Sequence, residues 1–124
     1  MQLTKTQKTA VETGNKNILV SAGAGTGKTR VLVERFLYLV TSGRALVTEI
    51  LTLTFTEKAA NEMKSRILER LAQLKLGSLV RDLESAYIST IHSFAARILR
   101  EHPLEAGVDR DFRVIEAEEC EFLK

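Results

Sequence analysis

A glycine-rich segment between two apolar segments constrains the fold of this chain most strongly. The segment SAGAGTGKT occupies residues 21–29, directly after the apolar run at 18–20. Residues 28–42 then carry apolar side chains at helical spacing and are followed by Gly43. We predict a buried strand over 17–21, a tight turn, and a helix over 28–42 that ends at the glycine. Such a turn lets backbone amides approach a bound group closely, because glycine has no side chain.

The lysine and threonine after the glycines indicate that the bound group is a phosphate chain. Residues 22–29 match the P-loop pattern G-x-x-x-x-G-K-[ST], except that Ala22 stands at its first position. In that pattern Lys28 reaches the β- and γ-phosphates and Thr29 binds Mg²⁺, while loop amides and the helix N-terminus surround the phosphates. The alternative is a purely structural glycine turn, but the flanking strand and helix favour a nucleoside triphosphate. The predicted phosphate-binding residues are Ala22, Gly23, Ala24, Gly25, Thr26, Gly27, Lys28 and Thr29.

The rest of the chain alternates between helical and extended patterns, which predicts an α/β fold with a parallel sheet and right-handed crossovers. Thr4 and Thr56 are candidate N-caps, Gly14 ends the first helix, and Pro103 ends a later one. Helix 57–75 carries one apolar side, formed by Ala60, Met63, Ile67, Leu68, Leu71 and Leu74. The predicted helices are 4–12, 28–42, 57–75, 79–84, 92–101 and 116–124, and the predicted strands are 17–21, 50–55, 86–91 and 112–115.

Composition limits the class of protein. The 124 residues suffice for about one small domain with a core. The sequence contains no run of roughly 18 apolar residues, so no membrane span is predicted. The N-terminus also lacks the apolar core of a signal peptide. Cys120 is the one cysteine, which excludes an internal disulfide and leaves an ordinary thiol. We therefore expect a cytoplasmic protein. The net charge of +2 is too small to indicate a nucleic-acid partner, although acidic residues concentrate in 101–124.

Four segments in the order expected for one family strengthen the P-loop interpretation. They are Leu3-Thr4 with Gln7, AGAGTGKTRVL at 22–32, TLTFTEKAANEMKSRI at 52–67 and STIHSF at 89–94. These segments resemble the glutamine motif and motifs I, Ia and Ic of superfamily 1 DNA helicases of the UvrD/Rep type. The resemblance spans nearly the whole chain, and it implies a RecA-like P-loop NTPase fold that is incomplete here.

The resemblance also implies a nucleotide site that takes ATP and Mg²⁺. Gln7 would read the adenine, and its amide can pair with the N6/N7 edge of that base. Arg30 would lie over the base or ribose, although a surface arginine is an equally good interpretation. Lys28 and Thr29 would be the catalytic residues of the loop.

A second implied site binds single-stranded DNA at the carboxyl ends of two strands, where α/β sheets place ligands. Phe55 would stack on an unpaired base; the alternative is a core phenylalanine that closes the sheet. A solvated lysine and a structural histidine are the alternatives at Lys58 and His92, and Phe94 is assigned to the core. The predicted DNA-binding residues are Thr54, Phe55, Thr56, Lys58, Thr90, His92 and Ser93.

The acids that hydrolysis requires are not visible. No aliphatic strand here ends in the Asp-Glu pair that holds Mg²⁺ and positions water in the family. We therefore expect residues 1–124 to be the N-terminal portion of the first motor domain (1A) of a longer protein, inactive by itself. The tail 101–124 resembles the AddA and RecB-like helicase-nuclease subunits more than UvrD.

Three functions are compatible with parts of this pattern. The first is an ATP-dependent helicase that moves along single-stranded DNA and unwinds the duplex at junctions, with a possible partner nuclease or helicase subunit. The second is a stand-alone nucleotide- or DNA-binding module without turnover. The third, a small P-loop kinase or GTPase, leaves the segments 52–67 and 89–94 unexplained.

Overall fold

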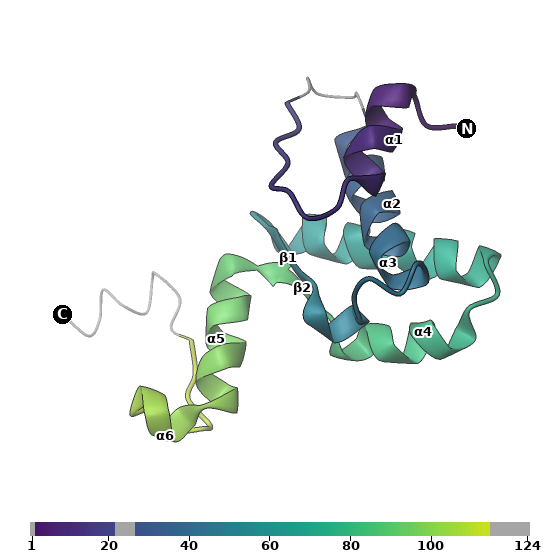
Figure 1. The fold of residues 1–124 in the computed structure, drawn as a ribbon. Coiled ribbons are helices and arrows are strands. Elements are labelled where there is room, and N and C mark those ends of the chain that lie inside the picture. The colour runs from purple at the N-terminus through teal and green to yellow at the C-terminus, as the bar shows by residue number, and fades with distance from the viewer. Residues whose placement is uncertain (1, 22–26, 115–124) are drawn as a thin grey trace.

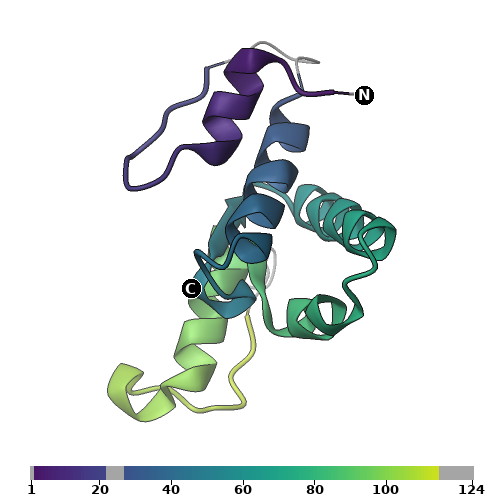
Figure 2. The same cartoon turned by 45° about the vertical axis from the view of Figure 1, so that its right-hand side comes forward.

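The computed structural model describes residues 2–21 and 27–114. Figure 1 shows α1 packed on α2 at one end of the molecule, while α5 and α6 extend from the opposite end. The same separation of α1 from α6 persists in the turned view of Figure 2. The elements are α1 (Lys5–Glu12), α2 (Lys28–Thr41), η1 (Val47–Glu49), β1 (Leu51–Thr54), α3 (Glu57–Gln73), α4 (Gly77–Asp82), η2 (Leu83–Ser85), β2 (Tyr87–Thr90), α5 (Ile91–Glu101) and α6 (Pro103–Ala106).

The sheet of the described residues consists of β1 and β2, which pair in parallel. The register runs from Leu51 opposite Tyr87 to Thr54 opposite Thr90, so both strands end at the same edge. A parallel pair needs a crossover, and here α3 and α4 supply it. The predicted mixed α/β fold with a parallel sheet is confirmed at this level.

The core lies between the helices and one face of this sheet. The buried positions of α3 recur at spacings of three or four residues, which places them on one side of the helix. They pack with buried residues of α2, β2 and the two short 3₁₀ helices. The core cluster is Val33, Phe36, Leu37, Val47, Met63, Ile67, Leu71, Leu83, Ala86 and Ile88.

Two predicted strands are wrong. Residues 17–21 form no strand, and the side chain of Leu19 is 93% exposed. Residues 112–114 also form no strand, and 115 lies outside the described residues. The physical reason is that a strand needs a hydrogen-bonded neighbour, and the ladder in the described residues joins only β1 and β2. The predicted helix over 116–124, with Cys120, also lies outside the described residues.

The other predicted elements are present, and their ends lie within two residues of the predicted ones. Thr4 and Thr56 cap α1 and α3 as predicted, because each hydroxyl accepts a backbone N–H of the first turn. Helix 92–101 ends before Pro103, and this proline also occupies the first turn of α6. The predicted piece at 79–84 is α4 continued by η2. None of the helices within 2–21 and 27–114 combines the length and apolarity that a membrane crossing requires.

Candidate functional site

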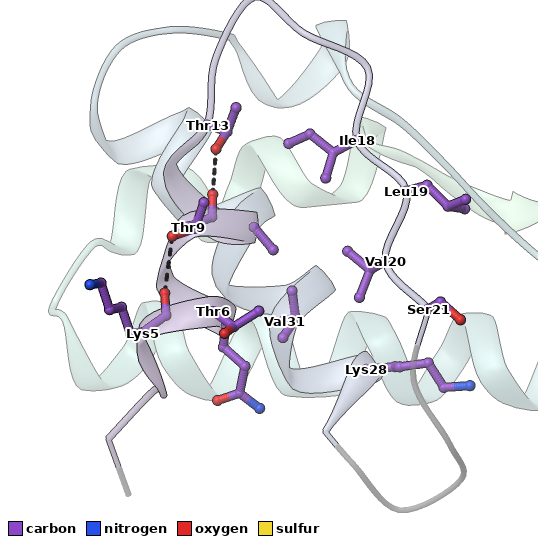
Figure 3. A pocket seen from close by; sticks show the side chains of 12 residues that line it. Lys5, Thr6, Thr9, Thr13, Ile18, Leu19, Val20, Ser21, Lys28 and Val31 are labelled. Atoms are coloured by element: carbon purple, nitrogen blue, oxygen red, sulfur yellow. Dashed lines mark hydrogen bonds between the residues drawn. The ribbon is translucent and has the colours of Figure 1, made fainter.

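A cavity of about 530 Å³ lies between α1, the segment 18–21 and the start of α2. Its walls combine the apolar side chains of 18–20 with the polar face of α1, and Lys28 stands at its edge (Figure 3). The apolar run that was predicted as a strand therefore lines a cavity. The lining residues are Lys5, Thr6, Gln7, Thr9, Ala10, Thr13, Ile18, Leu19, Val20, Ser21, Lys28 and Val31.

The Gln7 side chain is held beside the end of the glycine loop. Its Oε1 accepts the backbone N–H of Thr4 (2.9 Å), while the Thr4 hydroxyl accepts the N–H of Gln7 (3.2 Å). This reciprocal capping box fixes the direction of the amide. A methyl group added to Gly27 would lie 3.3 Å from Gln7 Nε2. The amide of α1 and the last glycine of the loop are therefore neighbours.

The start of α2 has the geometry of an anion-binding helix N-terminus. Gly27 is the N-cap residue with φ 85°, a left-handed conformation that disfavours other residues. Within the described residues no side chain caps this end, and the first amides of such a helix start can bind an anion. Lys28 is exposed, and Thr29 is half-buried in the first turn.

Five of the predicted loop residues cannot be placed, because Ala22, Gly23, Ala24, Gly25 and Thr26 lie outside the described residues. Arg30 is half-buried and borders a different hollow between α2 and α3, together with Glu34 and Arg70. Its predicted position over the nucleotide stays a prediction.

The second predicted site lies where β1 and β2 end. Phe55 follows β1 with 96% of its surface exposed, so the alternative of a core phenylalanine is wrong. Lys58 and His92 are exposed in the first turns of α3 and α5. The parallel register brings these two helix starts to one edge of the sheet. Phe94 is only half-buried and stands edge-on to Tyr87, with ring centroids 5.9 Å apart.

The threonine hydroxyls at this edge are used by the fold. Thr54 Oγ1 donates to the carbonyl of Thr56 (2.9 Å), and Thr56 Oγ1 accepts the N–H of Ala59 (3.1 Å). Thr90 is buried, and its hydroxyl accepts the N–H of Ser93 (3.1 Å). These contacts shape the turns between strands and helices, so the three threonines position the edge whether or not they touch a ligand.

Comparison with known proteins gives the family. The model of the UvrD/REP helicase N-terminal domain matches residues 3–123. This chain belongs to that family. The helicase resemblance of the four segments is therefore confirmed.

Several curated proteins are similar to this helicase domain over almost its whole length. An ATP-dependent helicase/nuclease subunit from Clostridium kluyveri is 40% identical, across 98% of this chain and 11% of that protein. Proteins of the same name from Pediococcus pentosaceus and Exiguobacterium sibiricum are 40% and 42% identical, each across 99% of this chain and 11% of the relative. The chain thus spans about a tenth of the length of these relatives. The resemblance of 101–124 to helicase-nuclease subunits agrees with these names.

Glu57 is a residue of this helicase domain that sequence reasoning missed. Ser93 Oγ donates to its Oε1 at 2.6 Å, and Thr90 Oγ1 lies 3.2 Å from the same oxygen. These hydrogen bonds, the one from Ser93 first, lower the pKa of Glu57 below its ordinary value, and the charge of Lys64 acts in the same direction. The carboxylate joins the starts of α3 and α5. Its partners lie 33 and 36 residues away in the sequence, so no local sequence pattern predicts these contacts.

Arg35 is the second missed residue. Its Nη1 donates to the carbonyl oxygens of Ala10 (3.0 Å), Val11 (3.2 Å) and Thr13 (2.8 Å). A guanidinium of α2 therefore binds the C-terminal end of α1 in this helicase domain. The position of Arg35 among the apolar residues of helix 28–42 gave no signal of this contact.

Proposed function

We propose that this chain is part of the ATP-binding motor domain of an ATP-dependent DNA helicase, of the kind found in helicase-nuclease subunits. The observation that carries the proposal is the closeness of Gly27 to the amide of Gln7, a residue that lines the cavity. This arrangement places the amide proposed to bind the base next to a glycine in the left-handed conformation, at the start of α2. The names of the relatives, which describe ATP-dependent helicase/nuclease subunits, support the same reaction class.

The residues present fit a magnesium nucleotide. In the proposed site, the amides at the start of α2 and the charge of Lys28 bind phosphate oxygens, and the hydroxyl of Thr29 ligates Mg²⁺. Gln7 faces the adenine, because its amide can both donate and accept along the edge of that base. The apolar side chains of 18–20 supply the apolar wall common to small-molecule sites. The finer fold assignment, a RecA-like P-loop NTPase, rests on this fit and on the family.

The proposed DNA surface is the edge formed by the ends of β1 and β2. Phe55 offers an exposed aromatic ring for base stacking, and Lys58 and His92 add polar contacts beside it. The hydroxyl of Ser93 already donates to Glu57, so a phosphate contact by Ser93 would use its remaining acceptor lone pairs or require rearrangement. Single-stranded DNA and duplex junctions are the proposed substrates.

The proposal covers residues 1–124 as the N-terminal portion of domain 1A. The small share of each relative that is matched supports a longer protein that supplies the acidic pair and the second motor domain. A partner nuclease or helicase subunit is proposed because the relatives are named as subunits.

Substitution of the loop lysine tests the ATP site. In the full-length protein, Lys28→Ala should abolish DNA-stimulated ATP hydrolysis, because the charge on the β- and γ-phosphates is lost, and should leave single-stranded DNA affinity largely unchanged. Phosphate release and fluorescence anisotropy measure the two quantities. Lys75→Asn, directly after the C-cap residue of α3, is the control: it removes an exposed charge, and asparagine tolerates the left-handed backbone at this position. Normal hydrolysis in Lys28→Ala would remove the P-loop assignment.

A further inference from the structure

The helix that carries Gln7 lies against α2 but buries little of its own surface. Only Val11 is buried among the residues of α1. The last turn of α1 contains no basic residue, so nothing within the helix offsets the negative end of its dipole. A short helix with one buried side chain is marginal by itself, since most helical stability comes from tertiary packing.

Arg35 supplies hydrogen-bond donors and a positive charge to the C-terminal end of α1. The carbonyl of Thr9 is already bonded to Thr13, by both its backbone N–H (3.0 Å) and its hydroxyl (2.6 Å). The next carbonyls, those of Ala10 and Val11, have no later intrahelical donor and are met by the guanidinium of Arg35. The half-buried cation therefore both satisfies these acceptors and opposes the helix dipole.

This contact and the nucleotide site lie on the same two helices. Arg35 stands seven residues, about two turns, after Lys28 on α2. At the other end of α1, the Gln7 amide lies beside Gly27. Arg35 therefore binds one end of α1 to α2, while at the other end of α1 the Gln7 amide lies close to the residue that starts α2.

We infer that Arg35 is a positioning residue for adenine recognition: it fixes α1 on α2, so that the Gln7 amide is held at the base-binding end of the cavity. This inference rests on the proposed ATP site. Arg35 acts through Gln7, and it adds selectivity for adenine over other bases. Guanine presents an acceptor where adenine presents its N6 donor, so Gln7 cannot pair with both in the same way.

The test uses full-length protein and the kinetics of DNA-stimulated hydrolysis of ATP and GTP. Arg35→Met keeps most of the apolar stem and removes every donor, and Arg35→Lys restores a cation with fewer, shorter-reaching donors. Arg35→Met should raise KM for ATP by about three- to tenfold and leave KM for GTP and both kcat values near those of the wild type. The KM for ATP of Arg35→Lys should fall between those of the wild type and Arg35→Met. Arg66→Met, which removes only a surface pair with Glu62, is the control.

A double variant separates positioning from general support of the fold. In a Gln7→Ala background, Arg35→Met should cause no further loss of ATP-over-GTP selectivity, because the residue through which Arg35 acts is already gone. Equal losses for ATP and GTP, or an unchanged KM for ATP, would overturn the inference. If Arg35→Met does not fold, Arg35→Lys decides, and a wild-type ATP-over-GTP ratio in that variant overturns it.

Failure of the underlying ATP site would look different. A wild-type protein without any preference for ATP over GTP would remove the adenine role of Gln7, and the inference with it. A selective wild-type protein whose Arg35→Met variant is equally selective would leave the ATP site intact and remove only the role of Arg35.

Discussion

At the scale of single residues, Phe55 shows how exposure separates a binding role from a packing role. An aromatic side chain that is 96% exposed gains almost nothing from the hydrophobic effect, so its presence at the end of β1 calls for another explanation. Stacking on an unpaired base would provide one, because every base has an aromatic face. In the proposed DNA site, Phe55 would contribute stacking and Lys58 would contribute charge. The two contributions to DNA affinity can be measured separately.

Phe55→Ala should weaken binding of single-stranded DNA by about 1–3 kcal/mol without reducing protein stability. The dependence of affinity on salt should stay the same, because stacking releases no counterions. Lys58→Ala should instead lower the salt slope by about one if the lysine contacts a phosphate. Fluorescence anisotropy across a salt series measures both effects. Leu104→Ala, which removes another side chain that is more than nine-tenths exposed, is the control; an unchanged affinity in Phe55→Ala would exclude stacking.

At the scale of elements, the ends of the helices show which local signals are reliable. Gly43 stops α2 as predicted: it has φ 75°, and the N–H groups of Gly43 and Arg44 bond to Val40 and Leu39. The same pattern of bonds ends α3, but there Lys75 occupies the left-handed position with φ 58°. The sequence placed this helix end at 75 rather than 73, because no glycine marks it.

The link between α3 and α5 through Glu57 should make the stability of the protein depend on pH. Hydrogen bonds lower the pKa of Glu57 in the folded state, so their contribution is fully present above the ordinary value of 4.5. It is lost as pH falls through the lowered folded-state pKa. Because Glu57→Gln removes the charge, the difference in unfolding free energy between wild type and this variant should shrink with acidification below 4.5.

The titration of Glu57 itself can be followed by carboxyl carbon NMR. Ser93→Ala removes the larger cause of the shift, so the pKa of Glu57 should rise toward 4.5 in that variant. Ser78→Ala, in α4, is the matched serine control. A pKa of Glu57 that does not move in Ser93→Ala would contradict the hydrogen bond and the connection of α3 to α5 that depends on it.

At the scale of the whole molecule, one core joins helices from separate parts of the chain. Ile67 of α3 is fully buried among residues of α2, β2 and the 3₁₀ helices, whereas its neighbour Leu68 is 39% exposed. The bidentate contact of Arg70 with Glu34, at 2.8 and 3.3 Å, joins α3 to α2 beside this core and raises the pKa of Arg70. The core thus holds α2 and the crossover helix α3 together.

Removal of a side chain from this core should affect the whole fold. Ile67→Ala should lower the free energy of unfolding by about 2–5 kcal/mol, because it deletes buried methyl groups and leaves a cavity. Leu68→Ala, next to it on the same helix, should cost clearly less, since the side chain already contacts water. Urea denaturation followed by circular dichroism compares the two, and equal losses would show that the assigned core face of α3 is wrong.

The sequence by itself determined the features that depend on neighbours within about four residues: the caps at Thr4 and Thr56, the apolar face of α3 and the glycine stop of α2. Only the tertiary structure decided the exposure of Phe55, the failure of 17–21 to form a strand, and the contacts of Glu57 and Arg35. The physical reason is sequence separation. A capping box closes inside one turn, whereas Arg35 meets carbonyls 22 to 25 residues away, and its partners exist only once two helices have packed.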